Sequence, residues 1–440
     1  MSPVCGRNSA SSIITEIFQV TTTIFTEMSF FCNRLGVNSV QIAGIIIEYN
    51  PLHRGHLHLM EQVRARLGPD AAVIGVMSGD FVQRGDFAVL QKRARAEAAV
   101  KSGMDLVLEL PLPWAVSSAE GFAGGGVRTL LATGLVTHLA FGSECGDAAA
   151  LNEVAACLDS GAYHAGVRRF LGEGMSFAAC RQAAVGAVLG DGRAALLEGP
   201  NNNLGVEYCR ALLRHAPGIR PLTVPRRGAA HDGPAGSGRY PSSSAIRELL
   251  RAGERETALA LMAPAMREVY EKEEAAGRAP VFSETCERAI LARLRSMTAA
   301  DFAALDRGRE GLWNRLYSAS RGAVSVAEVL ERAKTKRYAH ARLRRMVLWA
   351  YLGLTPGDVP DKIPYLRVLA ANETGRALLA RMRKTAAVPV LTKPSHVRRL
   401  DQAAQELFAL EARAADLYAL AYPDLAAAGG SAWKEGPVIV

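Results

Sequence analysis

Patterns typical of buried strands alternate with helical patterns through the first half of the chain. Residues 42–47 form a continuous apolar run, which is typical of a parallel strand covered on both faces. Apolar residues then recur at helical spacing over 57–67, until Gly68-Pro69 ends the helix. Further strands are predicted over 72–77, 105–110 and 139–141, and a further helix over 92–102. This alternation predicts an α/β fold with a doubly wound parallel sheet.

The pattern changes after about residue 250, where the signals for strands fade. Helical spacing is found over 247–262, 286–297, 327–333, 343–352 and 402–420. We therefore expect a sheet domain over 40–255, followed by a mostly α-helical domain over 256–440. Residues 1–39 fit neither domain, and we expect a disordered extension there or translation from a start upstream of the natural one.

The composition of the 440-residue chain, 49% hydrophobic and 22% charged, is that of a globular protein. It excludes disordered, collagen-like and disulfide-framework chains. No stretch of 18 uncharged apolar residues occurs, so neither a transmembrane helix nor a membrane partner is expected. The seven cysteines include no CxxC pair, which favours reduced thiols and a cytoplasmic location.

Basic residues are concentrated in the predicted helical domain. The chain has 52 Lys and Arg against 43 Asp and Glu, but residues 331–400 alone have 16 against four. The densest group holds Tyr338 and four basic residues, Lys336, Arg337, Arg344 and Arg345. Such a concentration favours a polyanion as the partner of this domain, and a solvated helical face is the alternative.

The strongest motif joins the first strand to the first helix and reads Asn50-Pro51-Leu52-His53-Arg54-Gly55-His56. A helix N-terminus offers unpaired backbone N–H groups and the positive end of the helix dipole, which suit phosphate. Gly55 lets a phosphate approach the backbone closely, and His53 and His56 share one face of the first turn. Their imidazoles can donate hydrogen bonds to a nucleotide α-phosphate under attack. Metal ligation and a structural role are the alternatives, although spacing shows no third metal ligand.

A second motif lies near the end of the sheet domain. Ser242-Ser243-Ser244 leads directly into a predicted helix that carries Arg247. Small hydroxyl residues at a helix start cap the helix and can also bond phosphate oxygens, to which Arg247 adds a fork of donors. Capping alone is the alternative. Together with the His-x-Gly-His turn, the motif indicates a nucleotide site that includes Ser243, Ser244 and Arg247.

These two motifs on a parallel sheet resemble the nucleotidylyltransferase superfamily and, more narrowly, the bacterial tRNA(Met) cytidine acetate ligase family. The resemblance spans about residues 41–400. It is carried, in order, by Glu48-Tyr49-Asn50-Pro51-Leu52-His53-Arg54-Gly55-His56, Met77-Ser78-Gly79-Asp80-Phe81-Val82-Gln83-Arg84-Gly85, Asp105-Leu106-Val107-Leu108-Glu109-Leu110-Pro111, Phe141-Gly142-Ser143-Glu144, Pro200-Asn201-Asn202-Asn203-Leu204-Gly205 and Thr335-Lys336-Arg337-Tyr338. The chain departs from the family pattern at Asn203, which replaces an apolar residue, in the Gly-rich loop 225–238, and in residues 1–39, which have no counterpart.

The resemblance implies an enzyme that uses ATP to convert acetate to acetyl-adenylate, releasing pyrophosphate. The acetyl group then passes to N4 of the wobble cytidine of elongator tRNA(Met), which gives N4-acetylcytidine and AMP. It further implies that residues 40–255 are an ATP-binding catalytic domain and that 256–440 are a tRNA-binding domain. No stable protein partner is implied.

The resemblance also assigns contact residues. In this family ATP is held by the segment from the first strand into the first helix, here Ile47, Glu48, Tyr49, Asn50, Pro51, Leu52, His53, Arg54, Gly55, His56, Leu57 and His58. Further ATP contacts are implied at Gly142, at Asn201 or Asn202, and at Arg226 or Arg227. The tRNA is expected to contact the basic group, Lys336, Arg337, Arg344 and Arg345.

The implied chemistry needs orientation and charge neutralisation rather than a protein nucleophile. No Ser-His-Asp or Cys-His arrangement stands out, and Cys145 is interpreted as incidental. Mg²⁺ is expected as the usual partner of ATP phosphates, but its ligands are unknown. The strand-end acids Asp80, Glu109 and Glu144 either contact metal or substrate or are ordinary loop acids. Two other functions remain open: a small-molecule nucleotidylyltransferase acting on a cofactor precursor, and a non-catalytic RNA-binding protein.

Overall fold

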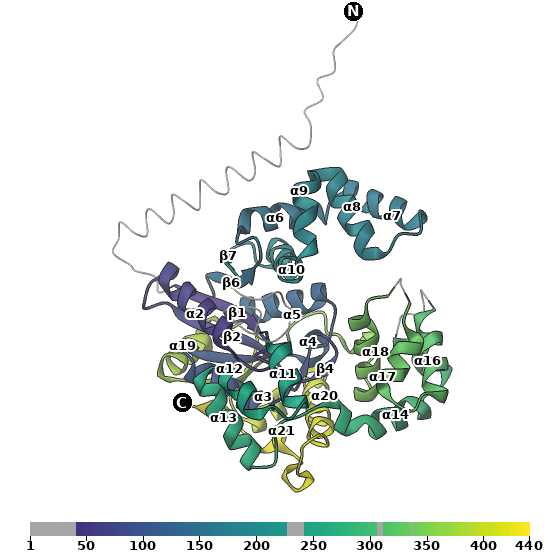
Figure 1. Ribbon diagram of the computed structural model, residues 1–440. Helices are drawn as coiled ribbons and strands as arrows, with labels where there is room; N and C mark the ends of the chain where they lie inside the picture. Colours follow the sequence, from purple (N-terminus) through teal and green to yellow (C-terminus); the bar gives the residue numbers. More distant parts are fainter. Residues whose placement is uncertain (1–40, 227–241, 306–310, 336–337) are drawn as a thin grey trace, which may run out of the picture. The chain divides into compact units, whose positions relative to one another are not determined.

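A mostly parallel sheet of eight strands forms the centre of the protein in the computed structural model, which describes residues 41–226, 242–305, 311–335 and 338–440 (Figure 1). Its strands are β1 (Ile42–Ile47), β2 (Ala72–Ser78), β5 (Leu106–Leu110), β6 (His138–Ser143), β7 (Arg220–Pro225), β8 (Leu366–Ala371), β9 (Val390–Leu391) and β10 (Val438–Ile439). They lie in the order β10-β8-β5-β2-β1-β6-β7, with β9 paired to β8. Paired strands are parallel, except that β8 is antiparallel to β5.

The direction in which successive strands are added to the sheet reverses at β1. From β1 the chain proceeds through β2 to β5 on one side, and it then crosses to β6 and β7 on the other. Such sheets bind ligands beyond the carboxyl ends of their strands at this reversal. The doubly wound parallel sheet predicted from the sequence is confirmed, and the residues that follow Ile47 stand at its binding position.

Helices cover both faces of the sheet. They are α2 (Arg54–Leu67), α3 (Lys92–Lys101), α4 (Leu112–Ala115), α5 (Ala119–Ala132), α6 (Ala148–Cys157), α10 (Pro200–His215), α11 (Ser243–Arg251), α12 (Arg255–Leu261), α13 (Pro264–Ala275) and α19 (Glu373–Thr385). Three further helices, α7 (Gly161–Gly172), α8 (Phe177–Leu189) and α9 (Asp191–Ala194), pack on one another and on α6 (Figure 1). One apolar core lies between the sheet and α5, α6, α10 and α19. A second core lies between the sheet and α2, α3, α11, α12 and α13.

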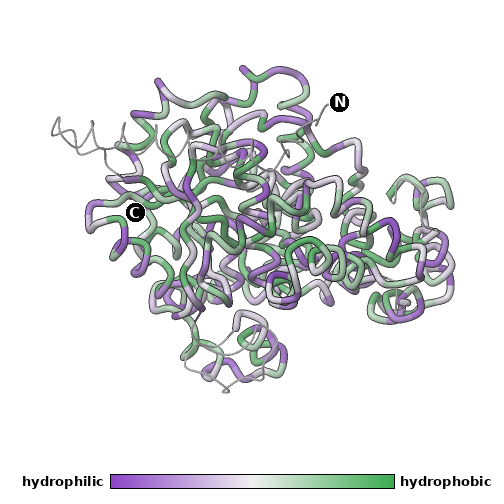
Figure 2. Tube along the Cα trace, turned by 90° about the horizontal axis from the view of Figure 1, so that it is seen from above, coloured by the Kyte–Doolittle hydropathy of each residue, from purple (hydrophilic) through white to green (hydrophobic). Residues whose placement is uncertain are grey.

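The remaining helices form a bundle with its own core. They are α14 (Glu287–Ser296), α15 (Ala299–Leu305), α16 (Leu312–Gly322), α17 (Val326–Ala333), α18 (His340–Leu352), α20 (Gln402–Ala419) and the short α21 (Ser431–Lys434). The core includes Phe81 and Phe87, which come from a hairpin of β3 (Phe81–Val82) and β4 (Asp86–Phe87). Through these two side chains the hairpin packs against the bundle. Hydrophobic and hydrophilic positions alternate along the chain as a whole, as expected where one face of a helix is buried (Figure 2).

Short 3-10 segments complete the described chain. They are η1 (Ala195–Glu198), η2 (Ser283–Cys286), η3 (Pro356–Asp358), η4 (Pro394–Arg399) and η5 (Leu425–Ala427). No helix in the described part of the chain is long and apolar enough to cross a membrane. The five cysteines within the described ranges are all free thiols, as the sequence predicted.

The structure corrects the sequence prediction in its second half. Strands do not end before residue 255, because β8 and β10 return to the central sheet. Strand β8 is hard to recognise in the sequence because Arg367 interrupts its six-residue apolar run. The charge of Arg367 is compensated by Glu109, whose Oε2 lies 3.3 Å from Arg367 Nη1. The single helix expected over 247–262 is two helices, α11 and α12, separated at Gly253, which has a φ of +78°. The domain boundary at residue 255 stays a prediction.

Candidate active site

The turn between β1 and α2 is built around two histidines. His53 is the N-cap of α2, and its Nδ1 accepts a hydrogen bond from the backbone N–H of Gly55 at 3.1 Å. The Nδ1 atom of His56 accepts one from the backbone N–H of His53 at 3.3 Å. The two rings stack with centroids 3.9 Å apart. Because each Nδ1 accepts a hydrogen bond, a ring with a single proton carries it on Nε2, where it can be donated.

A cavity of about 650 Å³ opens beside this turn, beyond the carboxyl ends of β1 and β6. It is lined by eleven of the residues predicted to bind ATP, Ile47, Glu48, Tyr49, Asn50, His56, Gly142, Asn201, Arg226, Ser243, Ser244 and Arg247. The structure therefore brings together motifs that lie almost 200 residues apart in the sequence. His53 is 4% exposed and supports His56 from behind rather than lining the cavity.

The remaining members of the predicted set lie outside the cavity lining. Among the described residues these are Pro51, Leu52, Arg54, Gly55, Leu57, His58 and Asn202. Leu52 is fully buried in the core on the α2 side of the sheet, which gives it a packing role. His58 lies within 4.0 Å of Glu61 on the same helix. Arg227 lies outside the described residues.

The N-terminus of α11 docks directly on the β1–α2 turn. Ser242 caps this helix by accepting a hydrogen bond from the backbone N–H of Ala245, and Ser243 Oγ donates to the carbonyl of Pro51 at 3.1 Å. Arg247 Nη1 donates to the carbonyl of Asn50 at 2.6 Å. Burial lowers the pKa of Arg247, although the carboxylates of Asp86 and Glu48 oppose the shift. The two sequence motifs thus form one structural unit.

The opposite wall of the cavity is organised by Glu144. Its carboxylate accepts hydrogen bonds from the backbone N–H groups of Asn201 at 3.0 Å and Asn202 at 2.6 Å. Burial would raise the pKa of Glu144, but these bonds and the Asn201 side chain outweigh burial, so the pKa is lowered. Arg226 Nη1 donates to Asn201 Oδ1 at 3.2 Å, and a Cβ on Gly142 would lie 3.3 Å from Arg226 Cγ.

The choice between the two asparagines follows from this geometry. The Oδ1 atom of Asn202 accepts from the backbone N–H groups of Glu144 and Cys145, at 3.0 and 3.1 Å, and the residue is 5% exposed. Asn201 faces the cavity together with Arg226. The structure therefore gives Asn201, rather than Asn202, as the asparagine that lines the cavity, with Arg226 beside it.

Glu48 and Arg95 hold the end of β1 in place. Glu48 Oε1 accepts a hydrogen bond from the backbone N–H of Gln83 at 2.7 Å. Burial raises the pKa of Glu48, and this bond and the nearby arginines offset only part of the shift. Arg95 is fully buried and donates to the backbone carbonyls of Glu48, Gly79 and Leu90. The sequence analysis missed Arg95, and the only signal was an arginine within an otherwise Ala-rich helix.

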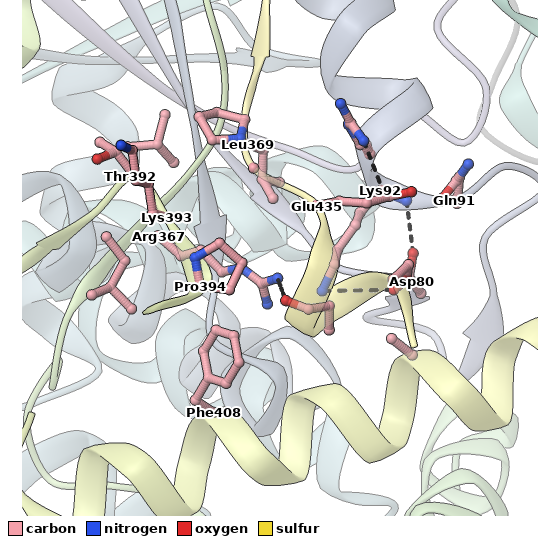
Figure 3. Close-up of a pocket in the computed structure, with 18 of the residues that line it drawn as sticks. Asp80, Gln91, Lys92, Arg367, Leu369, Thr392, Lys393, Pro394, Phe408 and Glu435 are labelled. Carbon is pink, nitrogen blue, oxygen red and sulfur yellow. Dashed lines mark hydrogen bonds and ion pairs between the residues drawn. The ribbon is translucent and has the colours of Figure 1, made fainter. Parts of the chain in front are cut away.

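The strand-end acids Asp80 and Glu109 belong to a buried ion network at the ends of β2 and β5, of which Asp80, Lys92 and Arg367 are labelled in Figure 3. Lys92 Nζ lies 2.6 Å from Glu109 Oε1 and 3.7 Å from Asp80 Oδ2, and Arg367 pairs with Glu109. The network borders a cavity of only about 40 Å³. Of the two interpretations left open by the sequence, the structure favours ordinary structural acids. No cluster of three metal-ligating side chains occurs within the described ranges.

The basic residues of 331–400 do not form one surface. Within the described ranges they divide among the region of α17 and α18 (Arg332, Lys334, Arg342, Arg344, Arg345), β8 and the segment before it (Lys362, Arg367), α19 (Arg376, Arg381, Arg383, Lys384) and the η4 region (Lys393, Arg398, Arg399). Arg344 lines the cavity, and its side chain is 44% exposed. Arg345 donates from Nη1 to the Gln83 carbonyl at 3.4 Å, and burial lowers its pKa to about 10. Lys336 and Arg337 lie outside the described residues.

The fold and the His-x-Gly-His turn are those of a nucleotidyl transferase, and the family model described as HIGH Nucleotidyl Transferase matches residues 40–431. The tRNA(Met) cytidine acetate ligases of Fervidobacterium nodosum and Kosmotoga olearia are 35% and 36% identical to this chain. These matches cover 84% and 88% of this chain and 88% and 96% of the relatives. The chain belongs to the tRNA(Met) cytidine acetate ligase family.

Solved structures agree with this assignment. The crystal structure of apo Thermotoga maritima TmcAL matches with a TM-score of 0.87 at 33% identity, over 91% of this chain and 100% of that chain. The same protein bound with alpha-thio ATP matches with a TM-score of 0.85 at 33% identity, over 91% and 99% of the two chains. The fold of this chain is therefore that of a protein whose structure contains an ATP analogue.

Proposed function

We propose that this protein is an ATP-dependent ligase that activates acetate as acetyl-adenylate and acetylates N4 of the wobble cytidine of elongator tRNA(Met). The observation that carries the proposal is the docking of α11 on the β1–α2 turn, through Ser243 to Pro51 and Arg247 to Asn50, at the reversal point of the sheet. The curated relatives carry the name of this activity, and one neighbour binds an ATP analogue.

The first step joins acetate to the α-phosphorus of ATP. A carboxylate oxygen of acetate attacks this phosphorus, the bond to the β-phosphate oxygen breaks, and pyrophosphate leaves. The protein supplies donors for the charge that develops: the Nε2–H of His56, the first-turn N–H groups of α2, and Arg247. Gly142, Asn201 and Arg226 form the nucleoside side of the same cavity. No protein nucleophile is needed, and Cys145 is not part of the cavity lining.

The second step transfers the acetyl group to RNA. The N4 amine attacks the acetyl carbonyl carbon, the carbon–oxygen bond to AMP breaks, and the amine releases one proton. The products are N4-acetylcytidine and AMP. Acetyl-adenylate needs no activation beyond its own leaving group, so the protein must hold the two reactants in contact and exclude water.

Mg²⁺ is proposed as a companion of ATP rather than as an ion held by the protein. The strand-end carboxylates are committed elsewhere, Asp80 and Glu109 to Lys92 and Glu144 to Asn201 and Asn202. These described residues do not fit a dedicated magnesium cage, whereas Mg²⁺ commonly binds through substrate phosphates and water. A tRNA substrate also supports the cytoplasm as the proposed location.

The proposal is tested with purified protein, ATP, ¹⁴C-acetate and a tRNA(Met) transcript. Labelled N4-acetylcytidine, identified by mass spectrometry of the nucleosides, is the expected product, together with pyrophosphate and AMP. The control substrate is the same transcript with uridine at the wobble position, which lacks the amine. Pyrophosphate release with no label in either transcript would favour the small-molecule nucleotidylyltransferase instead.

A further inference from the structure

The cavity beside the β1–α2 turn has a second wall that the ATP site leaves unused. Beyond the strand ends, the lining continues onto the helical bundle, where it includes Glu287 and Arg344. Beside them lie the exposed Ala327 and His340, and Ile290, Leu330, Val347 and Tyr351, which belong to the bundle core and are 4–6% exposed. We call these six residues the bundle wall. They come from α14, α17 and α18, and none belongs to the sequence motifs that bind nucleotide.

The bundle wall is held at a fixed position relative to the end of β1. Glu48 accepts the backbone N–H of Gln83, and the Gln83 carbonyl accepts Arg345 Nη1 from α18. The turn of the same hairpin packs on α18 so closely that a Cβ on Gly85 would lie 2.5 Å from Arg345 N. One short hairpin thus connects the strand end, where the α-phosphate is proposed to lie, to the helix that carries part of the wall.

The chemistry of acetyl transfer requires a second occupant of this cavity. The attacking amine must come within about 3–3.5 Å of the acetyl carbon. A nucleobase in an RNA loop reaches such a position by leaving its stack, and proteins then hold it against apolar or aromatic side chains. The polar strand-end wall suits phosphates and ribose, whereas the bundle wall offers the apolar surface that a base requires.

The charges at the cavity also fit a nucleotide within an RNA chain. Arg344 and Arg251 line the cavity with side chains that are 44% and 27% exposed. Arg344 lies 4.0 Å from the carboxylate of Asp86, whereas Arg251 pairs with Glu248 at 2.9 Å and Glu284 at 3.1 Å and lies 3.9 Å from Asp86. Guanidinium groups at a mouth can bind the phosphates on either side of an extruded nucleotide. A free small-molecule acceptor would give no reason for arginines beside an apolar wall.

We propose that the bundle wall is the binding site for the target cytidine of the tRNA, extruded from its loop so that N4 faces the acetyl-adenylate at the strand ends. This inference rests on the proposed function and adds the position of the second substrate. It separates the two halves of the reaction in space: variants of the bundle wall should affect transfer to RNA and leave adenylation intact.

Ala327 offers a direct test because its exposed position on α17 lines the cavity, so a larger side chain fills the wall without entering the core. The variant is Ala327→Trp, and the matched control is Val324→Trp, three residues away at a side chain that is 78% exposed and outside the lining. Three quantities are measured on each full-length protein: acetate-dependent ATP–pyrophosphate exchange, transfer of ¹⁴C-acetate to the tRNA(Met) transcript, and filter binding of that transcript.

We expect Ala327→Trp to keep exchange within about twofold of the parent and to lose transfer by about 100-fold, since misplacement by ~1 Å can cost that much. Filter binding should change little, because contacts to the RNA backbone dominate affinity. Val324→Trp should match the parent in all three. Normal transfer by Ala327→Trp would overturn the proposal, and so would an equal loss of exchange, which would assign the wall to ATP. An unmodified parent protein that fails to label tRNA refutes the proposed function instead.

Discussion

Gly85 lies against the backbone of Arg345, where a Cβ would come within 2.5 Å of the amide nitrogen. Gly85 also has a φ of +78°, a conformation that glycine alone adopts without strain. The hairpin that carries it links the catalytic end of β1 to α18 through Gln83. Close approach at this one residue therefore sets the distance between the two walls of the cavity.

Gly85→Ala should separate α18 from the hairpin. The positive φ costs about 1–2 kcal/mol and the overlap with backbone about 1–3 kcal/mol, so the loss of unfolding free energy should exceed that of a strained glycine alone. Gly353→Ala is the matched control, because Gly353 follows the same helix with a φ of +71° and has open space around it. Urea unfolding of both variants measures the difference. Equal losses would mean that the Gly85 contact contributes nothing.

His53 and His56 should respond differently to substitution. His56→Ala removes a donor that we propose faces the α-phosphate, and we expect acetate-dependent ATP–pyrophosphate exchange to fall by about 10²–10³-fold. His53→Ala removes the cap of α2 and should cost about 1 kcal/mol of stability as well. His53→Asn restores a capping oxygen and should recover that stability. His164→Ala on α7 is the control, because that histidine is exposed and lies outside the cavity.

Arg226 should contribute to ATP affinity rather than to the chemical step. Its guanidinium donates to Asn201 in the part of the cavity lining that we propose binds the nucleoside. Arg226→Ala should raise KM for ATP by about tenfold, the value of one charge-assisted hydrogen bond, with kcat within a few-fold. Arg220→Ala at the exposed start of β7, the strand that ends just before Arg226, is the control. A fall in kcat at unchanged KM would place Arg226 at the reacting phosphate.

Arg344 should contact tRNA, whereas the basic residues of α19 should not. Arg344→Gln is expected to weaken filter binding of the tRNA(Met) transcript and to reduce the slope of log K against log salt by about one. Arg376→Gln and Arg383→Gln on α19, which packs against the sheet, serve as controls with the same change in net charge. If the α19 variants lower the slope as much as Arg344→Gln, the RNA contacts a different surface.

The buried carboxyl of Glu411 should make stability fall with rising pH. Burial raises the pKa of Glu411 to about 7, and Tyr365 Oη donates to its Oε2 at 2.8 Å. A carboxyl whose pKa is raised by folding stabilises the protein fully below its unfolded pKa, and that contribution is lost as the pH rises through about 7. Glu411→Gln should reduce this loss, of the order of 1–3 kcal/mol between pH 5 and 8. Melting temperatures across that range measure it, and identical pH profiles would contradict the assignment.

The sequence predicted those helices and strands in which every residue has the character that the element requires. Residues 42–47 are uniformly apolar, and β1 has these bounds. The sequence did not indicate β7, because Pro221 and Pro225 argue against a strand. The two prolines are tolerated because β7 lies at the edge of the sheet. The sequence did not indicate β8 either, since the charge of Arg367 is acceptable only with Glu109 beside it. Compensation by a residue distant in sequence leaves no local pattern.

The residues of the site also divide into those that the sequence located and those that it did not. The His-x-Gly-His turn and Ser243–Arg247 are local motifs, and the sequence located both. The choice of Asn201 over Asn202 depends on Glu144, which is about 57 residues away, and the hairpin contact of Gly85 depends on α18. The basic window 331–400 misled in one respect: its charge is contiguous in sequence but divides among α17–α18, β8 and the segment before it, α19 and the η4 region in space.

A crystal structure of the protein with a non-hydrolysable ATP analogue tests the central claim most directly. We predict that the α-phosphate lies within hydrogen-bonding distance of His56 Nε2 and of the first-turn N–H groups of α2, with the base toward Asn201 and Arg226. The bundle wall should remain uncovered by the analogue. Triphosphate density away from the β1–α2 turn, or an adenine packed on Leu330 and Tyr351, would contradict the account.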